Sequence, residues 1–439
     1  MSKKIRAQPA GTFVSIAALL TLILIAGTAG GRAAQKASPA RAINAKSAAV
    51  MAATAEVLRE TSEVRKLGVL HSIRSGAQSR EEIERMIIRS INESSTPEEM
   101  RASERALKKF GLLPADFQLR PFIIKLLTEQ VAGYYDPKTQ EFYLADWIDI
   151  DGQRPVMAHE LTHALQDQHF NLRRFEKWPR GDSDAELAAH ALIEGDATIA
   201  MLFYAMRHPL QALSMMRSDT ASEASMEQLK QAPRALRESL LFPYEQGSAW
   251  AMQLHRRGGW EEVSRAYTIL PQSTEQILHP EKYFAREAPV KASVPNLSRL
   301  LGVGWRRTDT DVNGEWSLYL MLEEYLKSDT ESRDAAAGWG GDSYALYEGV
   351  RPGEVMIAQL TMWDTEEDAR QFFDAYARRT SLRYGIERID VSGHQPASVY
   401  EWRTSEGNVV VERRGARVAI LEGVPKRADA KKLRRTFWR

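Results

Sequence analysis

Two histidines and a glutamate stand close together in the segment PVMAHELTHALQDQHF, residues 155–170. His159 and His163 are four residues apart, and on an α-helix this spacing places both imidazoles on one face, one turn apart. The pattern H-E-x-x-H is a signature of zinc sites in which the glutamate acts as general base. The segment therefore predicts a metal centre with Glu160 as the base. The alternative is an ordinary amphipathic helix with two hydrogen-bonded histidines.

A catalytic zinc needs a third protein ligand, and two residues compete for this position. His169 lies six residues after His163, which is the third-histidine position of an extended form of the motif. That form needs a glycine where this chain has Gln166, so the helix is expected to continue and to turn His169 away. Glu194, in the segment SDAELAAHALIEGDATIAM, is the better candidate.

Glu194 lies in the middle of its helical segment, with His190 and Thr198 one turn to either side. A carboxylate in the middle of a helix is expected where that side of the helix faces a partner, and the two histidines are the candidate partners. His190 and Thr198 are then expected to orient the metal ligands. Two alternatives stay open: a solvated Glu194 on an exposed face, and His190 as a ligand itself.

At these residues the sequence resembles the gluzincin metallopeptidases, whose metal ligands are the two histidines of H-E-x-x-H and a glutamate on a following helix. The segments HELTH and IEGDA fit that arrangement. The resemblance implies Zn²⁺ as the cofactor, with His159, His163 and Glu194 as its ligands and Glu160 as the general base.

A further segment, FPYEQGSAWAMQL, looks like the Y-E-K-G segment of the aminopeptidase branch, whose tyrosine stabilises the oxyanion. Carried over, that tyrosine is Tyr244, and Gln246 replaces the lysine. The sequence has no G-x-M-E-N segment, which in that branch grips the free amino end of the substrate. The resemblance covers about residues 125–285, and it favours an endopeptidase over an aminopeptidase.

The same region also looks like a group of uncharacterised bacterial envelope proteins that share GYYDP, HELTHALQDQ, EGDA and STEQILHPEKY. This likeness implies no known substrate. In the last of these segments, His279 and Tyr283 are predicted to line a substrate cleft. The alternative is a helix-ending loop with partly buried aromatic side chains.

Composition narrows the kind of protein that carries these residues. The chain has 439 residues, a net charge of +1 and no cysteine. The absence of cysteine excludes disulfides and thiolate zinc ligands, so any zinc must be held by histidines and carboxylates. The balanced charge gives no reason to expect nucleic acid as a partner.

The N-terminus is typical of a targeting segment. Lys3, Lys4 and Arg6 precede an apolar run over residues 13–26 and then small residues. Residues 1–29 are therefore expected to be a signal peptide or an N-terminal membrane anchor that contacts the membrane if uncleaved. Either way the protein is expected to be exported, to the periplasm or beyond, and residues 30–65 to form a tether.

The elements that would position the site follow from periodicity. Helical patterns cover residues 63–127, 154–170, 183–207 and 221–266, and a β-hairpin is expected over residues 131–146. Ser183 and Glu186 suggest a capping box for the third helix. The predicted fold is α+β: a mostly helical gluzincin-like domain (66–290) with a short edge β-sheet, followed by a smaller α+β domain (291–439).

Together these patterns predict an exported zinc metallopeptidase that hydrolyses peptide or protein substrates. The hairpin over residues 131–146 lies where such enzymes carry the edge strand that binds the substrate backbone. The alternative is a non-catalytic envelope scaffold or binding protein with a structural or inactive metal site. A fourth protein ligand, such as His190 or His169, would favour the scaffold.

Overall fold

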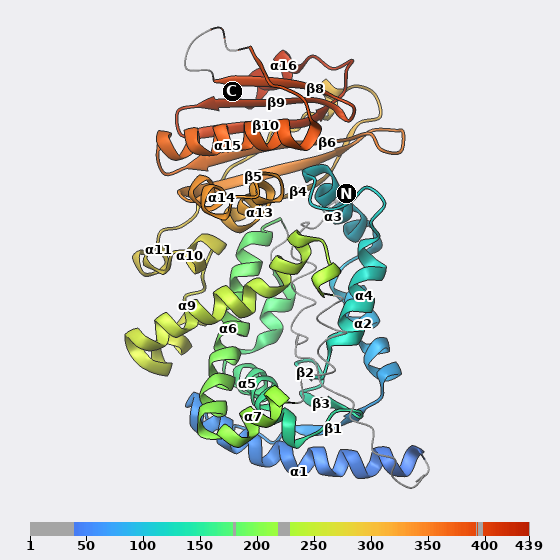
Figure 1. The fold of residues 1–439 in the computed structure, drawn as a ribbon, viewed down its shortest axis with the longest axis vertical. Helices are drawn as coiled ribbons and strands as arrows, with labels where there is room; N and C mark the ends of the chain where they lie inside the picture. Colours follow the sequence, from blue (N-terminus) through green and yellow to red (C-terminus); the bar gives the residue numbers. More distant parts are fainter. Residues whose placement is uncertain (1–38, 179–180, 218–228, 392, 394–397, 439) are drawn as a thin grey trace, which may run out of the picture.

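The computed structural model describes residues 39–438 with the exception of 179–180, 218–228, 392 and 394–397. Figure 1 shows a helical part at one end of an elongated molecule and a β-sheet at the other. The main helices are α1 (Pro39–Arg65), α2 (Arg80–Ser94), α3 (Pro97–Phe110), α4 (Leu119–Gln130), α5 (Arg154–Phe170), α6 (Ser183–Arg207), α7 (Pro209–Arg217), α9 (Arg234–Ala266), α10 (Thr274–Leu278), α11 (Pro280–Ala285), α12 (Ser298–Leu301), α13 (Gly314–Leu326), α14 (Asp329–Ala336), α15 (Glu366–Tyr384) and α16 (Ala430–Phe437). The strands are β1 (Arg74–Gln78), β2 (Gly133–Asp136), β3 (Glu141–Ala145), β4 (Arg306–Asp311), β5 (Trp339–Glu348), β6 (Val355–Trp363), β7 (Ile389–Asp390), β8 (Val399–Thr404), β9 (Gly407–Arg414) and β10 (Arg417–Val424).

Helix α1 corrects the expectation of a tether. Residues 39–65 form one continuous helix that packs against α5, α6 and β1, at the bottom of Figure 1. Val50 and Val57 of this helix are fully buried, and Arg65 at its end is buried as well. The alanine-rich composition that suggested a tether also suits a helix, and the buried apolar side chains fix it to the protein. Residues 30–38 lie outside the described part of the chain.

The predicted hairpin is confirmed, and it belongs to a three-stranded sheet. Strands β2 and β3 pair antiparallel, and β1 pairs parallel with β3, so that β2 forms one edge. Strand β1 lies within residues 63–127, for which the sequence predicted only helix. Its sequence RSGAQ has no alternation of apolar and polar residues, so no local pattern indicates a strand there.

The α+β fold class is confirmed by the second sheet. Its seven strands are all antiparallel, in the order β4-β5-β6-β10-β9-β8-β7. Helix α15 begins with a capping box of Thr365 and Asp368 and lies across one face (Figure 1). Helices α13 and α14 join it there, although the sequence analysis had not predicted them.

The two faces of this sheet bury different apolar groups. Along β9, Val409 and Val411 belong to the larger core, whereas Val410 between them belongs to a smaller one. This alternation is the two-residue period of a strand with both faces covered. Helix α16 closes the smaller core through Leu433 and Phe437. The basic C-terminal segment therefore packs its apolar side chains on the sheet.

The predicted boundary near residue 290 does not separate two independent cores. One hydrophobic cluster runs from Val50 in α1 to Ile420 in β10. Within it, Phe242 of α9 packs against Trp316 of α13, with ring centroids 4.8 Å apart. The sheet and the helical part are therefore joined by a shared apolar core.

Candidate metal centre

Helix α5 carries the H-E-x-x-H residues through the interior. Its bounds are those predicted, with Pro155 in the first turn and Asn171 in the left-handed conformation at the end. All residues from 155 to 167 are buried. The helix has no solvent-facing side over this stretch, so its polar side chains must find partners inside the protein.

Helix α6 packs on α5 and carries Glu194. Its bounds are as predicted, but the capping box is not formed. Asp182 is the N-cap, and its carboxylate accepts from Ala185 N at 3.2 Å. Ser183 instead donates its N–H and hydroxyl to Asp311 of β4. Asp182 caps one residue earlier because its carboxylate is a good acceptor at a helix start.

His159, His163 and Glu194 converge in one buried group that could hold a metal ion. Glu194 Oε2 lies 3.1 Å from Nε2 of His159 and 3.5 Å from Nε2 of His163. Ligand atoms about 2.0–2.1 Å from a tetrahedral zinc stand about 3.3 Å from one another. The three side chains are therefore spaced as ligands of such an ion.

Unsatisfied polar atoms also fit a bound cation. Nε2 of His163, Oε1 of Glu194, Oε1 of Glu160 and Nδ1 of His159 are buried and have no hydrogen-bond partner within the described part of the chain. Buried polar atoms are normally satisfied by protein, water or an ion. Two of these atoms, Nε2 of His163 and Oε1 of Glu194, belong to the ligand group. An imidazole nitrogen and a carboxylate oxygen are ligand atoms that suit zinc.

The electrostatics of the group favour a cation beside Glu194. Burial alone would raise the pKa of Glu194, but the neighbouring His163 and His159 outweigh it and lower the pKa to about 2. Burial likewise opposes protonation of His163, yet the Glu194 carboxylate raises the pKa of His163 to about 9. Burial lowers the pKa of His159. The carboxylate is thus held in its charged form.

Glu160 is held beside the ligands by the edge strand β2. The backbone N–H of Tyr135 donates to Oε2 of Glu160 at 2.9 Å. The Tyr135 hydroxyl donates to Asp167, also at 2.9 Å, so that strand and helix are fastened at two points. Burial raises the pKa of Glu160 to about 8. The second oxygen, Oε1, is the atom left to accept a proton.

Tyr244 of α9 lies next to the ligands, as the resemblance implies. Its ring stands 6.2 Å from that of His159, and its hydroxyl interacts with the Glu194 carboxylate. Burial raises the pKa of Tyr244, and the carboxylates of Glu194 and Glu160 add to this effect. The tyrosine therefore stays protonated and can donate a hydrogen bond.

Two glycines bring α9 this close to α6. A Cβ on Gly195 would stand 2.2 Å from the carbonyl oxygen of Gly247, and a Cβ on Gly247 would stand 2.3 Å from that of Ala191. The two backbones therefore touch, which no larger side chain would allow. Gly195 follows Glu194 directly, and Gly247 lies one turn beyond Tyr244. This contact sets the distance between the two functional side chains.

No hydrogen bond of His190 or Thr198 to the three ligand residues is present among the described residues, so the prediction that they orient the ligands has no support in the contacts. The ring of His190 donates from Nδ1 to the carbonyl oxygen of Glu186 at 2.8 Å. Thr198 Oγ1 is buried and has no partner within the described residues. A position one turn from Glu194 on the same helix does not by itself bring a side chain within reach of the Glu194 carboxylate or of the two histidines on α5.

Gln166, which replaces the glycine of the extended motif, orients His163. Its Oε1 accepts from Nδ1 of His163 at 2.9 Å, and its Nε2 donates to Asp196 at 3.0 Å. Gln166 and Asp196 are both fully buried. Both residues stand in the segments HELTHALQDQ and EGDA, which also carry the proposed ligands. This position was the available signal, because polar side chains close to metal ligands commonly hold those ligands in place.

Three other predicted residues lie in structural contacts. His169 is exposed near the end of α5, donates to the carbonyl of Gly68 at 2.7 Å and lies outside the group of ligand-type atoms, so it is a helix-end residue. His279 pairs with Glu315 of α13 at 2.9 Å, and the Tyr283 hydroxyl donates to the carbonyl of Ile269 at 2.8 Å. These contacts within the protein favour the alternative of a helix-ending loop with partly buried aromatic side chains over a substrate cleft.

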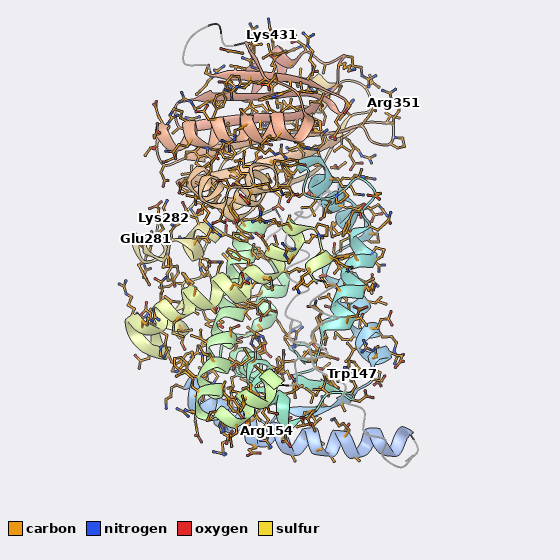
Figure 2. The ribbon with its side chains drawn as sticks, in the orientation of Figure 1. Trp147, Arg154, Glu281, Lys282, Arg351 and Lys431 are labelled. Carbon is orange, nitrogen blue, oxygen red and sulfur yellow. The ribbon has the colours of Figure 1, made fainter. Side chains whose placement is uncertain are left out.

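A second acidic group is filled by a lysine. Glu275, Glu287 and Asp364 are spaced as metal ligands could be. The Lys282 ammonium lies among them, 2.6 Å from Glu275, 2.8 Å from Glu287 and 2.5 Å from Asp364. Figure 2 places Lys282 far from Arg154, the first residue of α5. The lysine supplies the positive charge, so this group is a salt-bridge cluster.

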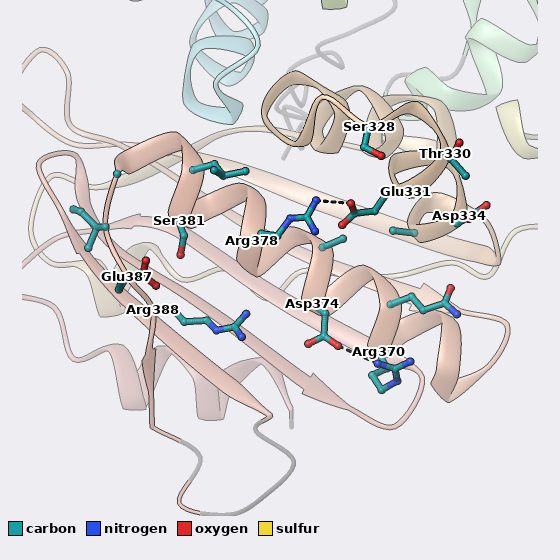
Figure 3. Close-up of a pocket in the computed structure, with 16 residues that line it drawn as sticks. Ser328, Thr330, Glu331, Asp334, Arg370, Asp374, Arg378, Ser381, Glu387 and Arg388 are labelled. Carbon is teal, nitrogen blue, oxygen red and sulfur yellow. Dashed lines mark hydrogen bonds and ion pairs between the residues drawn. The ribbon is translucent and has the colours of Figure 1, made fainter.

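A large surface groove lies in the C-terminal part, between α14 and α15 (Figure 3). Its volume is about 1240 Å³. Its charged side chains pair with one another, as Arg378 does with Glu331 and Arg370 with Asp374. None of its lining residues belongs to the metal centre. The groove therefore has no chemical connection with the buried histidines.

Comparison with known proteins concerns the sheet only. Residues 299–434 match the model of a domain of unknown function, DUF8575. This match includes β4 to β10 and leaves the metal centre outside. No curated protein and no solved structure matches the chain.

Proposed function

We propose that this protein is an exported, zinc-dependent peptide-bond hydrolase of the gluzincin type, with an endopeptidase activity. The observation that supports it most is the convergence of two imidazoles and one carboxylate at ligand spacing, with a buried glutamate next to them. When bound there, zinc lowers the pKa of a coordinated water to about 7 and polarises a carbonyl group.

The residues of the chain then divide the remaining work. Glu160, fixed through Oε2 by Tyr135, accepts a proton at Oε1 and returns it to the leaving nitrogen. The Tyr244 hydroxyl donates a hydrogen bond to the oxygen that gains negative charge. Strand β2 is a sheet edge and contacts Glu160 directly, so it is suited to hold an extended peptide by its backbone groups.

The scaffold alternative is less well supported. It would be favoured by a fourth protein ligand, and within the described residues the group contains three. Neither of the two candidates for a fourth ligand, His190 or His169, belongs to this group of ligand-type atoms. The described arrangement therefore leaves a coordination position for water, as catalytic zinc sites do.

Export belongs to the same proposal. No described helix combines the length and the apolar character that a bilayer span requires. The apolar run over residues 13–26, on which the expectation of a signal peptide or anchor rests, lies outside the described residues.

Metal removal tests the proposal as a whole. We expect the purified protein to contain about one zinc per chain and to cleave an N-terminally blocked, fluorescently quenched unfolded protein. A chelator should abolish the cleavage, and added Zn²⁺ should restore it, because the base has no activated water to act on without the ion. Zinc content and initial rates are the measurements. Zinc-loaded protein that cleaves no member of a broad peptide library would instead support the scaffold.

A substitution of Tyr244 by phenylalanine tests the oxyanion role. Loss of one such donor typically costs about 3–4 kcal/mol, so kcat should fall roughly 10²–10³-fold. The ring and its packing on His159 remain, so zinc content should be unchanged. Steady-state kinetics of the variant give the answer, and an unchanged kcat with a raised KM would assign Tyr244 to substrate binding instead.

A further inference from the structure

A buried chain of hydrogen bonds extends from His163 to the N-terminal helix. Its first link is the Gln166 amide, whose Nε2 donates to two acceptors, the Ile193 carbonyl and the Asp196 carboxylate, each at 3.0 Å. A flipped amide would place its oxygen against these two acceptors. The amide oxygen must therefore face His163, which has to donate from Nδ1. In the neutral ring, the form that can bind a metal, the lone pair is then on Nε2, the ring nitrogen that lies 3.5 Å from Glu194 Oε2.

The next link is the Asp196 carboxylate, which accepts from residues of α1 and α5 and from Tyr267, the residue that caps the end of α9. Besides Gln166, it accepts from the Tyr267 hydroxyl at 2.9 Å. Arg65 at the end of α1 makes two bonds to it, from Nε to Oδ1 at 2.5 Å and from a terminal nitrogen to Oδ2 at 3.0 Å. This two-point contact fixes the plane of the carboxylate as well as its position.

Arg65 is itself held rigidly. Its side chain and that of Asp196 are both 0% exposed. The guanidinium also donates to Ser264 Oγ at 3.1 Å and lies over the Trp260 ring at 4.7 Å. An ion pair of this kind can have a purely structural role, here the attachment of α1 to α6. This pair is also linked through Gln166 to His163, because the Gln166 amide donates to both the Ile193 carbonyl and Asp196. A change at Arg65 is therefore expected to affect a metal ligand as well.

We propose that Arg65 is a positioning residue of the metal centre. Through Asp196 and Gln166 it fixes the ring orientation and the tautomer of His163, so the affinity of the site for metal depends on helix α1. This inference rests on the proposed function to the extent that it assumes metal binding by His159, His163 and Glu194.

Metal affinity is the direct test. We expect the full-length Arg65→Met variant, stripped of metal, to bind Zn²⁺ about 10–100-fold more weakly than wild type in competition with a chromophoric chelator, the effect typical of outer-shell residues. Gln166→Met, which leaves the Arg65–Asp196 pair intact, should show a similar loss. The visible absorption of the Co²⁺-loaded variants should also shift, because it reports the arrangement of the ligands.

Arg379→Met is the matched control. Arg379 pairs with Glu422 at 2.5 Å, both side chains are 0% exposed, and the pair lies between α15 and β10. This variant loses an equally buried ion pair, so it should be destabilised to heat while keeping wild-type zinc affinity and the wild-type Co²⁺ spectrum. A weaker zinc affinity in Arg379→Met as well would mean that lost stability alone explains the effect, and would overturn the inference.

The remaining outcomes separate the two proposals. Wild-type protein that binds no zinc contradicts the proposed function itself. Wild-type protein that binds zinc, with Arg65→Met and Gln166→Met equally tight, overturns the role of Arg65 alone. If Arg65→Met does not fold, Arg65→Lys takes its place, since lysine keeps the charge but cannot form the two-point contact. Wild-type affinity in that variant would also overturn the inference.

Discussion

Replacing Glu160 with glutamine is expected to lower kcat about 10²–10⁴-fold, the usual contribution of a general base, while zinc stays bound. Glutamine has nearly the same shape, and its carbonyl oxygen can still accept from the Tyr135 N–H that now bonds Oε2. It has no basic oxygen to take a proton. Burial raises the pKa of Glu160 to about 8 in the metal-free site, and the charge of a bound zinc ion would lower it, so that the carboxylate is available as a base.

The control for Glu160 is a half-buried glutamate with a similarly raised pKa. Burial also raises the pKa of Glu186 to about 8, and Glu186 lies two turns before Glu194 on α6, with its carbonyl bonded to His190. Glu186→Gln should therefore keep the wild-type rate. Initial rates and zinc content of both variants are compared on the same blocked substrate. A Glu160→Gln enzyme with undiminished kcat would remove the base assignment.

Replacing Glu194 with glutamine is expected to weaken zinc binding roughly 100-fold or more. Apparent binding energies of about 10–16 kcal/mol for four-ligand zinc sites correspond to about 3 kcal/mol for each ligand, and each 1.4 kcal/mol is a factor of ten. A neutral amide also removes the negative charge that lowers the cost of placing a dication among buried side chains. Turnover should disappear at zinc concentrations that saturate the wild type.

Glu315→Gln is the matched control for this variant. Glu315 is buried and pairs with His279 at 2.9 Å, much as Glu194 pairs with His159 at 3.1 Å, but it lies at the junction with the sheet. Zinc competition titrations should give wild-type affinity for Glu315→Gln. Equal zinc affinity of Glu194→Gln and wild type would exclude Glu194 as a ligand.

Local patterns were sufficient to predict the elements that carry the site. Helices α5 and α6 and the hairpin of β2 and β3 have the predicted positions, because periodicity and turn residues act over a few neighbours. The convergence of His159, His163 and Glu194 was also predicted, from the motif and the family resemblance. The role of Tyr244 stays a prediction, although the structure brings the residue beside Glu194.

Contacts between distant segments explain what was missed. Arg65 meets Asp196 across 131 positions, and no pattern within α1 indicates this partner. The same holds for Ser183, which bonds Asp311 instead of forming a cap. His190 was predicted, from its place on the helix, to orient the metal ligands, yet its ring donates to the carbonyl of Glu186 one turn earlier on the same helix. Tertiary packing decides such cases.

The backbone contact of Gly195 with Gly247 limits how the proposed hydrolase could admit a substrate. Helices that touch without intervening side chains cannot slide or rotate past each other without a clash, so α6 and α9 form a fixed wall that holds Glu194 and Tyr244 at constant separation. The hairpin of β2 and β3, in contrast, is held to α5 by the two hydrogen bonds of Tyr135. Hydrogen bonds of this kind can exchange for others, so we expect any opening for a substrate on the side of the hairpin.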